Sequence, residues 1–168
     1  PRPKMKFVHV HPGAEELGRV YQGDLLINAG MPEFASAARA LEPVSERWAE
    51  WTGGARADLE AWQQPVQVPG TVNMSEVMKL LRERLPRNAI ITNGAGNFSL
   101  WAHRFYRYGG FRTQLAPTSG AMGYGVPSAV AAKIVHAERT VIAFSGDGDF
   151  LMTGQELATA AQYDAKVT

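Results

Sequence analysis

The strongest constraint on this chain is a short apolar run that stops at a glycine-rich turn. Residues 141–144 are apolar and begin with two β-branched side chains, and Gly146-Asp147-Gly148 follows one residue later. This order is typical of a buried strand followed by a turn that needs glycine. In open α/β sheets, ligands bind beyond the carboxyl ends of the strands. The turn therefore predicts a ligand site that contains the Asp147 carboxylate.

The chemistry of this turn suits a diphosphate bound through Mg²⁺. Glycine allows backbone N–H groups to approach an anion closely, and Asp147 offers a hard oxygen ligand to the metal. An ordinary turn is the alternative, because Asp-Gly marks turns in many proteins. A calcium loop of the EF-hand type is excluded, because Leu151 and Met152 stand where that loop needs Asp or Asn and then Gly.

Composition narrows the classes of function. The 168 residues suffice for one or two small domains, and the net charge of +1 argues against a general electrostatic interaction with nucleic acid or an anionic membrane. The chain has no cysteine, so disulfides, thiolate zinc sites and a cysteine nucleophile are excluded. No apolar run approaches the roughly 20 residues of a membrane span, and no signal peptide is recognised. We expect a cytoplasmic protein whose start, at Pro1, is processed or cut.

The first 42 residues predict a parallel α/β arrangement. Strands are expected at residues 5–11 and 25–29, and helices at 14–20 and 32–41. His9 and His11 share one face of the first strand, where they could bind a metal. With no third ligand nearby in the sequence, solvated or hydrogen-bonded histidines are the favoured interpretation.

Residues 43–72 are expected to connect two domains. Proline and glycine punctuate this segment, and a helix is predicted over much of 45–63. Trp48, Trp51 and Trp62 are expected to pack that helix onto a domain or a partner, and an aromatic ligand site is the less favoured alternative.

A second unit begins at Asn73, where Asn73 and Glu76 resemble a capping box. The residues that follow place one apolar stripe on a helix: Met74, Val77, Met78, Leu81 and Leu85. A short buried strand at 89–92 then runs into a second glycine turn at 93–97.

Residues 101–112 mix cations with aromatic side chains. Nucleic-acid binding is one interpretation, but the near-zero net charge favours a surface helix and loop at a subunit contact. A third glycine cluster, at 120–127, opens a helix rich in small residues. Its spacing is not that of a Rossmann fingerprint.

The end of the sequence predicts three further features. Thr140 to Ser145 forms the strand before the Gly-Asp-Gly turn. Thr153 and Glu156 match a capping box that would start a helix ending near Gln162. Lys166 to Thr168 is expected to begin the next strand.

Taken together, the three glycine clusters resemble one family, the thiamine diphosphate-dependent enzymes of the acetolactate synthase type. The matching segments are Asn93-Gly-Ala-Gly-Asn-Phe-Ser-Leu-Trp101, Thr118-Ser-Gly-Ala-Met-Gly-Tyr-Gly-Val-Pro127 and Ser145-Gly-Asp-Gly-Asp-Phe-Leu-Met-Thr153, followed by Gln155-Glu156-Leu157. The resemblance implies an α/β fold with a parallel sheet flanked by helices, preceded by the remnant of a second, flavoprotein-like α/β domain. Residues 1–42 then correspond to the end of a middle domain, 43–72 to a linker with a helix, and 73–168 to the first part of the diphosphate-binding domain.

The resemblance also implies roles for particular residues. Asp147 would bind Mg²⁺, and the backbone N–H groups of Gly148 and Asp149 would bind the diphosphate. The Met122 side chain would separate the two cofactor rings and keep the cofactor bent. The residues assigned to thiamine diphosphate are Ala95, Asn97, Gly120, Ala121, Met122, Gly146, Gly148 and Asp149.

Two departures from the family qualify these expectations. Phe98 stands where such synthases commonly have His, which weakens the substrate assignment. The family's second Mg²⁺ ligand is an Asn on the following strand, and no Asn follows Gly148. In the family, the activating glutamate belongs to an amino-terminal domain of a neighbouring subunit, so the resemblance implies no catalytic residue of that kind in this chain. We therefore expect an internal fragment, inactive alone, of an enzyme that assembles as a homodimer or tetramer.

The implied activity is decarboxylation of a 2-keto acid with carboligation, as in acetolactate synthases. Two alternatives stay open at this point. One is a related thiamine diphosphate-dependent decarboxylase or oxidase, and the other is a non-catalytic α/β module that serves assembly.

Overall fold

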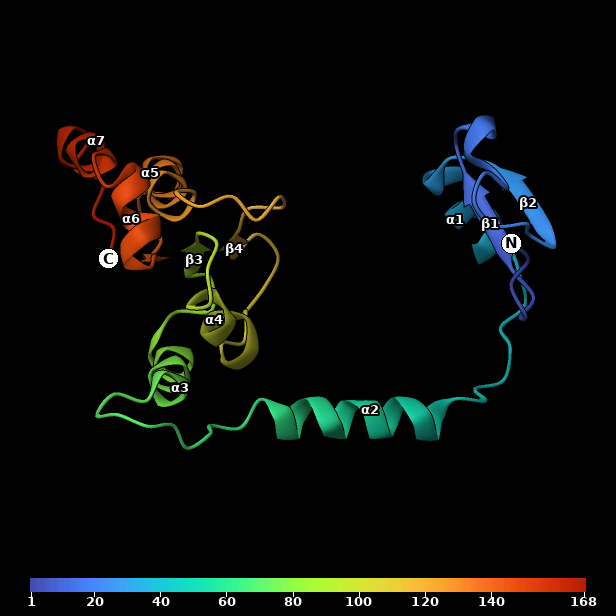
Figure 1. Ribbon diagram of the computed structural model, residues 1–168, viewed down its shortest axis with the longest axis horizontal. Helices are drawn as coiled ribbons and strands as arrows, with labels where there is room; N and C mark the ends of the chain where they lie inside the picture. Colours follow the sequence, from blue (N-terminus) through green and yellow to red (C-terminus); the bar gives the residue numbers. More distant parts are fainter. The chain divides into compact units, whose positions relative to one another are not determined.

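A computed structural model describes all residues, 1–168, and divides the chain into two compact units. The first unit is Pro1–Glu50 and the second is Trp51–Thr168, so the division falls within helix α2 (Figure 1). The assignment of residues 1–42 and 73–168 to particular domains of the family stays a prediction. No helix combines the length and the apolar composition that a membrane span requires.

The first unit is built on two parallel strands. Strand β1 (Val8–His11) pairs with β2 (Leu25–Asn28), and helix α1 (Met31–Arg39) follows. These elements confirm the predicted strands and the second predicted helix. The helix expected at 14–20 is a single 3₁₀ turn, η1 (Ala14–Glu16), because Gly18 adopts a left-handed φ of +74° shortly after it.

The two histidines of β1 are hydrogen-bonded to the crossover that joins the strands. The Gly13 N–H donates to Nδ1 of His11 at 3.0 Å, and the Gly18 N–H donates to Nδ1 of His9 at 3.4 Å. The hydrogen-bonded interpretation of His9 and His11 is therefore the one that the structure supports, and both side chains help to shape the crossover.

Helix α2 (Ala49–Trp62) confirms a helix in the connecting segment, and none of its residues is buried. Its last residue contacts the second unit, to which it belongs. Nε of Arg104 donates to the Trp62 carbonyl at 2.8 Å, and Cζ of Arg104 lies 4.6 Å from the centre of the Trp62 ring. Trp62 thus packs against a domain through Arg104, as predicted, although it is still 52% exposed, and Trp51 is more exposed, at 74%.

The second unit contains a three-stranded parallel sheet in the order β4-β3-β5. Its elements are α3 (Met74–Arg84), β3 (Ile90–Asn93), α4 (Ser99–Phe105), β4 (Gln114–Leu115), α5 (Gly125–Val135), β5 (Val141–Phe144), α6 (Asp147–Thr153) and α7 (Glu156–Gln162). A parallel sheet flanked by helices confirms the predicted α/β fold (Figure 1). Strand β4 was not predicted, because two residues are too short to show a strand period.

Helix α3 forms where the sequence predicts it and packs by its predicted stripe. Oδ1 of Asn73 accepts a hydrogen bond from the Ser75 N–H at 3.0 Å, which caps the helix. The five stripe residues pack with Ile91 of β3 and the buried side chains of α4 into one core. Helix α5 covers a second cluster, in which Ala129 and Ala132 pack against Ile90 and Val141.

The cation–aromatic segment at 101–112 is a helix end and a loop, as predicted, but it lies only partly on the surface. Ala102, Phe105 and Tyr106 are buried in the core with Ile91, so these aromatic side chains serve packing, whereas Phe111 is 89% exposed. Arg104 is held against Phe105 and Trp62 through its guanidinium group. Up to Phe105, the mixture of cations and aromatics thus reflects a helix that is buried on one face, and the remaining cations lie in the loop that follows it.

The predicted capping box at Thr153 and Glu156 is wrong. A helix already begins at Asp147, and Thr153 is its last residue rather than the cap of the next helix. The Thr153 hydroxyl donates to the Gly123 carbonyl at 2.8 Å instead, and Glu156 accepts a hydrogen bond from Thr159. A tertiary contact therefore competes successfully with the local cap.

The last residues extend the sheet at its β5 edge. The Ala143 N–H donates to the Thr168 carbonyl at 2.7 Å, and the Thr168 N–H donates to the Val141 carbonyl at 3.2 Å. These two bonds agree with the predicted start of a further strand next to β5.

Candidate functional site

Two of the three glycine turns leave the sheet side by side. Strands β3 and β5 are parallel neighbours in register, with Asn93 opposite Phe144, so both end at one edge of the sheet. The Gly94 N–H donates to the Phe144 carbonyl at 3.3 Å across this edge. The parallel pairing of two strands thus places residues 94–97 beside residues 145–149.

The third glycine segment reaches the same edge through the start of α5. The hydroxyl of Thr92 donates to the Gly125 carbonyl at 2.7 Å. A Cβ atom at Gly125 would lie 2.9 Å from the Gly94 nitrogen and 3.1 Å from the Phe144 carbonyl oxygen, which is too close for any side chain. Glycine at position 125 therefore lets helix α5 approach the sheet edge, and the three turns meet there.

The Asp147 carboxylate is available to a ligand. Asp147 is the first residue of α6, its side chain is exposed, and it forms no hydrogen bond or ion pair. The first intrahelical hydrogen bond runs from the Phe150 N–H to the Gly146 carbonyl, at 2.8 Å. The N–H groups of Asp147, Gly148 and Asp149 consequently have no partner within the helix. A carboxylate and several backbone donors lie together at this end of α6.

The segment Gly120–Met122 lies close to that helix end. A Cβ atom at Gly148 would be 3.6 Å from Cε of Met122, so the Met122 side chain lies beside the first turn of α6. Met122 is 45% exposed and Ala121 is exposed. Gly120 has a left-handed φ of +68° with open space where a side chain would be. An apolar side chain thus stands beside the backbone donors with space around it.

The remaining predicted residues, Ala95 and Asn97, belong to the turn after β3, which the Phe98 ring connects to the turn after β5. Ala95 is half-buried and Asn97 is exposed. The Phe98 ring covers two glycines at once, because Cβ atoms at Gly96 and Gly146 would lie 2.7 Å and 2.8 Å from it. This ring therefore links the turn after β3 to the turn after β5, in the position where the sequence resemblance leads one to expect a polar histidine.

The side chain of Asp149 has contacts that the sequence does not predict. Its side chain is 2% exposed, and its two carboxylate oxygens accept hydrogen bonds from the Gly123 N–H, at 2.6 Å, and from the Ser145 hydroxyl. A Cβ atom at Gly94 would overlap the same carboxylate. Sequence reasoning assigned a role only to the backbone of Asp149. In the sequence, the only local indication that the Asp149 side chain is hydrogen-bonded is its spacing of four residues from Ser145.

The arrangement fits a diphosphate with a divalent cation. Unpaired N–H groups suit phosphate oxygens, the free Asp147 carboxylate suits a hard cation, and Met122 offers an apolar contact to a ring. The structure contains no group of three or more His, Cys, Asp or Glu side chains that could hold a metal. A cation at Asp147 therefore needs further oxygen ligands from the bound molecule or from water.

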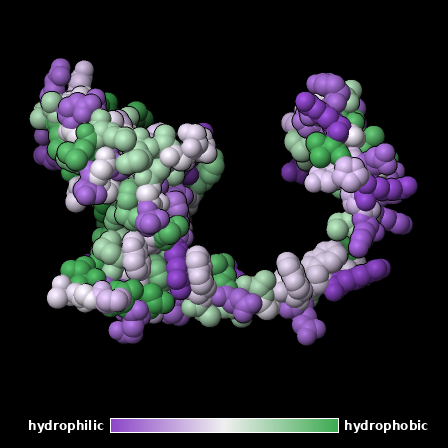
Figure 2. Space-filling view, viewed as in Figure 1, coloured by the Kyte–Doolittle hydropathy of each residue, from purple (hydrophilic) through white to green (hydrophobic).

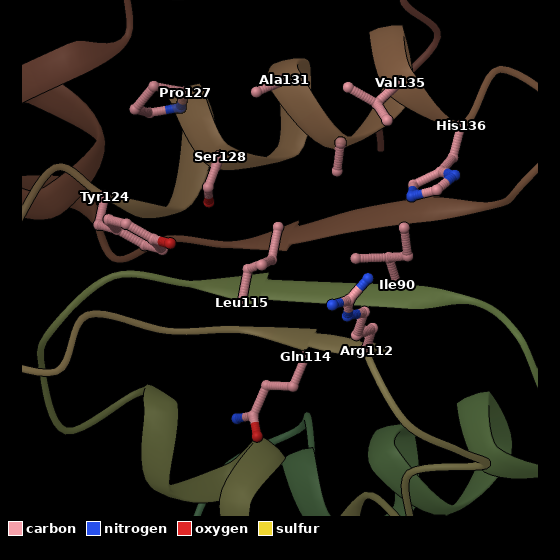
Figure 3. Close-up of a pocket in the computed structure, with 11 residues that line it drawn as sticks. Ile90, Arg112, Gln114, Leu115, Tyr124, Pro127, Ser128, Ala131, Val135 and His136 are labelled. Carbon is pink, nitrogen blue, oxygen red and sulfur yellow. The ribbon is translucent and has the colours of Figure 1, made fainter.

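A separate cavity of about 610 Å³ lies between helix α5 and strands β3 and β4 (Figure 3). Its walls are mainly apolar and include Leu115, Pro127 and Val135. None of the residues predicted to bind the cofactor lines it. This cavity is therefore distinct from the edge of the sheet where the glycine turns meet.

Comparison with known proteins agrees with this geometry. Residues 94–168 match the family "Thiamine pyrophosphate enzyme, C-terminal TPP binding domain". The acetolactate synthase large subunit of Lactococcus lactis is 29% identical over 92% of this chain, and isozyme 1 of Escherichia coli is 31% identical over 98%. The acetolactate synthase of Mycobacterium leprae is 32% identical over 95% of this chain.

The chain spans only part of these relatives. The alignments cover 27% of the Lactococcus lactis protein, 30% of the Escherichia coli protein and 27% of the Mycobacterium leprae protein. The matched domain contains all three glycine turns except the first residue of the first one. Residues 94–168 thus match the thiamine pyrophosphate-binding domain family, and the chain as a whole is similar to the large subunits of acetolactate synthases.

Proposed function

We propose that this chain is part of a thiamine diphosphate- and Mg²⁺-dependent enzyme that decarboxylates a 2-keto acid and joins the product to a second carbonyl compound. The observation that carries this proposal is the meeting of three glycine turns at one edge of the sheet, beside a free carboxylate. The acetolactate synthases among the relatives favour carboligation over simple decarboxylation or oxidation. The proposal includes assembly of the enzyme as a homodimer or tetramer, as the family resemblance implies.

Each part of the site has a defined task in this proposal. Asp147 holds Mg²⁺, and the N–H groups of Gly148 and Asp149 bind the diphosphate. Residues Ala95 and Asn97 border the diphosphate from the turn after β3. Bound thiamine diphosphate supplies the carbanion chemistry, whereas the protein binds, orients and desolvates it.

The ring end of the cofactor is assigned to the segment before α5. Backbone atoms of Gly120 would hold the pyrimidine end of the cofactor, and the Met122 side chain would support its rings. Because Met122 is apolar and stands next to the backbone donors of α6, it excludes water from one side of the site. By holding these two segments in place, the protein would orient the cofactor, and such fixed orientation is a large part of the rate enhancement in intramolecular reactions.

Cofactor binding by the 168-residue chain tests this proposal. We expect calorimetry to show weak binding of thiamine diphosphate that requires Mg²⁺. Asp147→Ala should abolish the Mg²⁺-dependent part, because no other carboxylate with a free side chain belongs to the site. Asp58→Ala, which removes an exposed carboxylate from α2, is the matched control and should leave binding unchanged.

Two results would contradict the proposal. If Mg²⁺-dependent binding persists in Asp147→Ala, Asp147 is not the metal ligand. Absence of binding to the unsubstituted chain, even at millimolar cofactor, would favour the non-catalytic assembly module, provided that Asp147→Ala then changes only stability.

A further inference from the structure

Both polar groups of one backbone residue, Gly123, are bound by side chains of helix α6. The Gly123 N–H donates to Oδ1 of Asp149 at 2.6 Å. The Gly123 carbonyl accepts from the Thr153 hydroxyl at 2.8 Å. Asp149 and Thr153 are four residues apart on α6, so they project from the same face of that helix. A single peptide segment is thus held at two points by one helix.

The contact is specific to glycine at position 123. Gly123 has a left-handed φ of +81°, and a Cβ atom there would lie 3.0 Å from Cγ2 of Thr153 and 3.1 Å from Cβ of Met152. Any other residue would strain the backbone and push the segment away from α6. The sequence of this loop therefore allows the close approach that the two hydrogen bonds need.

Asp149 makes this contact at a high cost in desolvation. Its carboxylate is 2% exposed, no cation pairs with it, and its second oxygen accepts from the Ser145 hydroxyl. A buried carboxylate is tolerated only when hydrogen bonds replace its water, and hydrogen bonds to a charged acceptor are stronger than neutral ones. Such a group holds its donors in fixed positions.

The two points of attachment lie between the parts of the proposed cofactor site. Met122 directly precedes Gly123, and Cε of Met122 lies 3.6 Å from the position that a Cβ atom at Gly148, in the first turn of α6, would take. Residues 147–149 of the same helix carry the carboxylate and the backbone donors. Movement of Gly123 relative to α6 would therefore separate the ring-binding part of the site from the diphosphate-binding part.

We propose that Asp149 and Thr153 are positioning residues that fix the Met122 side chain relative to the diphosphate-binding end of α6. This inference rests on the proposed function, because it assigns the two side chains to the same cofactor site. It predicts that loosening either hydrogen bond weakens recognition of the cofactor rings more than recognition of the diphosphate.

The experiment compares two probes in the presence of Mg²⁺: thiamine diphosphate and inorganic diphosphate. Thr153→Val keeps the shape of the side chain and removes the hydroxyl donor. We expect this substitution to weaken the affinity for thiamine diphosphate about five- to tenfold, which corresponds to the loss of one hydrogen bond. The affinity for inorganic diphosphate should change less than twofold. Thr153→Ser keeps the hydroxyl and should restore binding. Thr159→Val on α7 is the matched control and should change neither affinity.

Amide hydrogen exchange at Gly123 gives a readout that does not need the cofactor. In the unsubstituted chain this amide should exchange slowly, and in Thr153→Val and Asp149→Ala it should exchange at least about tenfold faster. If Asp149→Ala does not fold, the exchange rate of the Gly123 amide in Thr153→Val alone tests the inference.

The outcomes separate this inference from the proposed function. Equal weakening of both probes by Thr153→Val, or no rescue by Thr153→Ser, would overturn the positioning role and leave cofactor binding intact. If the unsubstituted chain binds neither probe, both the proposed function and the positioning role fail. A rapidly exchanging Gly123 amide in the unsubstituted chain would show that the two-point attachment does not exist in solution.

Discussion

Residues 1–50 and residues 51–168 both contain parallel strands with crossover connections, but only the second unit buries any residue. In the first unit, Val8, Leu25 and Leu26 of the two paired strands are each about half exposed. In the second unit, a third strand and helices on both faces bury β3 completely. The same local pattern thus gives a core only when both faces of the sheet are covered.

The surface of the first unit agrees with its lack of a core. Figure 2 shows hydrophilic side chains over much of the visible face of residues 1–50, with apolar atoms exposed among them. A two-stranded sheet is marginally stable in water without further packing. We infer that the second unit, which also carries the candidate site, provides most of the free energy of folding.

The largest expected effect comes from one substitution made in both sheets. Ile91 of β3 is fully buried, whereas Ile27 of β2 is half-buried. Ile91→Ala should lower the free energy of unfolding by about 3–4 kcal/mol, because it leaves a cavity in a closed core. Ile27→Ala should cost less than about 1 kcal/mol. Urea denaturation followed by circular dichroism measures both, and equal losses would contradict the comparison.

A smaller effect is expected where two backbones meet at the site. Gly94→Ala would force its new methyl group into the Asp149 carboxylate and should cost about 1–3 kcal/mol. Gly53→Ala is the matched control, since nothing lies within 4 Å of the position its Cβ would take. This change in helix α2 should stabilise by up to about 1 kcal/mol. Thermal unfolding would show opposite signs, and a neutral Gly94→Ala would disprove the close contact.

A side-chain cap distinguishes helix α3 from the helices of the first unit, although α4, α5, α6 and α7 of the second unit also lack one. Asn73 caps α3, whereas Gly13 and Gly30 precede η1 and α1 without a side-chain cap. Asn73→Ala should cost about 1 kcal/mol in urea denaturation, because it removes the acceptor for the Ser75 N–H. Asn88→Ala, at a side chain with no hydrogen bond, serves as the control. A larger loss for the control would show that the cap is not formed.

The smallest expected effect concerns alkaline pH. Burial, with a contribution from Tyr106, raises the pKa of Tyr108 to about 12. The unfolded tyrosine releases its proton near pH 10, so between pH 10 and 12 the unfolded state binds fewer protons than the folded state. Stability is therefore fully present below pH 10 and falls as the pH rises toward 12.

Tyr108→Phe should make this decline less steep, whereas Tyr163→Phe, at an exposed residue, should not. The urea midpoints at pH 9 and pH 11 give the measurement. Identical declines for the two variants would mean that Tyr108 is not buried in solution.

Periodic and capped elements could be predicted from the sequence. The stripe from Met74 to Leu85, the cap at Asn73 and the two apolar strands β3 and β5 depend on neighbours within a few residues. The glycine turns could also be predicted, because positions where two backbones approach closely require glycine, and glycine is read directly from the sequence.

Tertiary contacts could not be predicted in this way. Thr153 has the sequence context of a helix cap, but its hydroxyl binds Gly123, which is 30 residues away. The Asp149 side chain is buried between loops that only the folded sheet brings together. Strand β4 forms because Gln114 and Leu115 lie beside β3, not because of any period of their own.

Amide chemical-shift mapping of the 168-residue chain with thiamine diphosphate and Mg²⁺ tests the central claim most directly. The account predicts that amides of residues 94–97, 120–123 and 146–149 shift together along one binding curve, and that amides of residues 1–50 do not move. Shifts confined to one of these segments, or centred on residues 1–50, would contradict a single cofactor site at the edge of the three-stranded sheet.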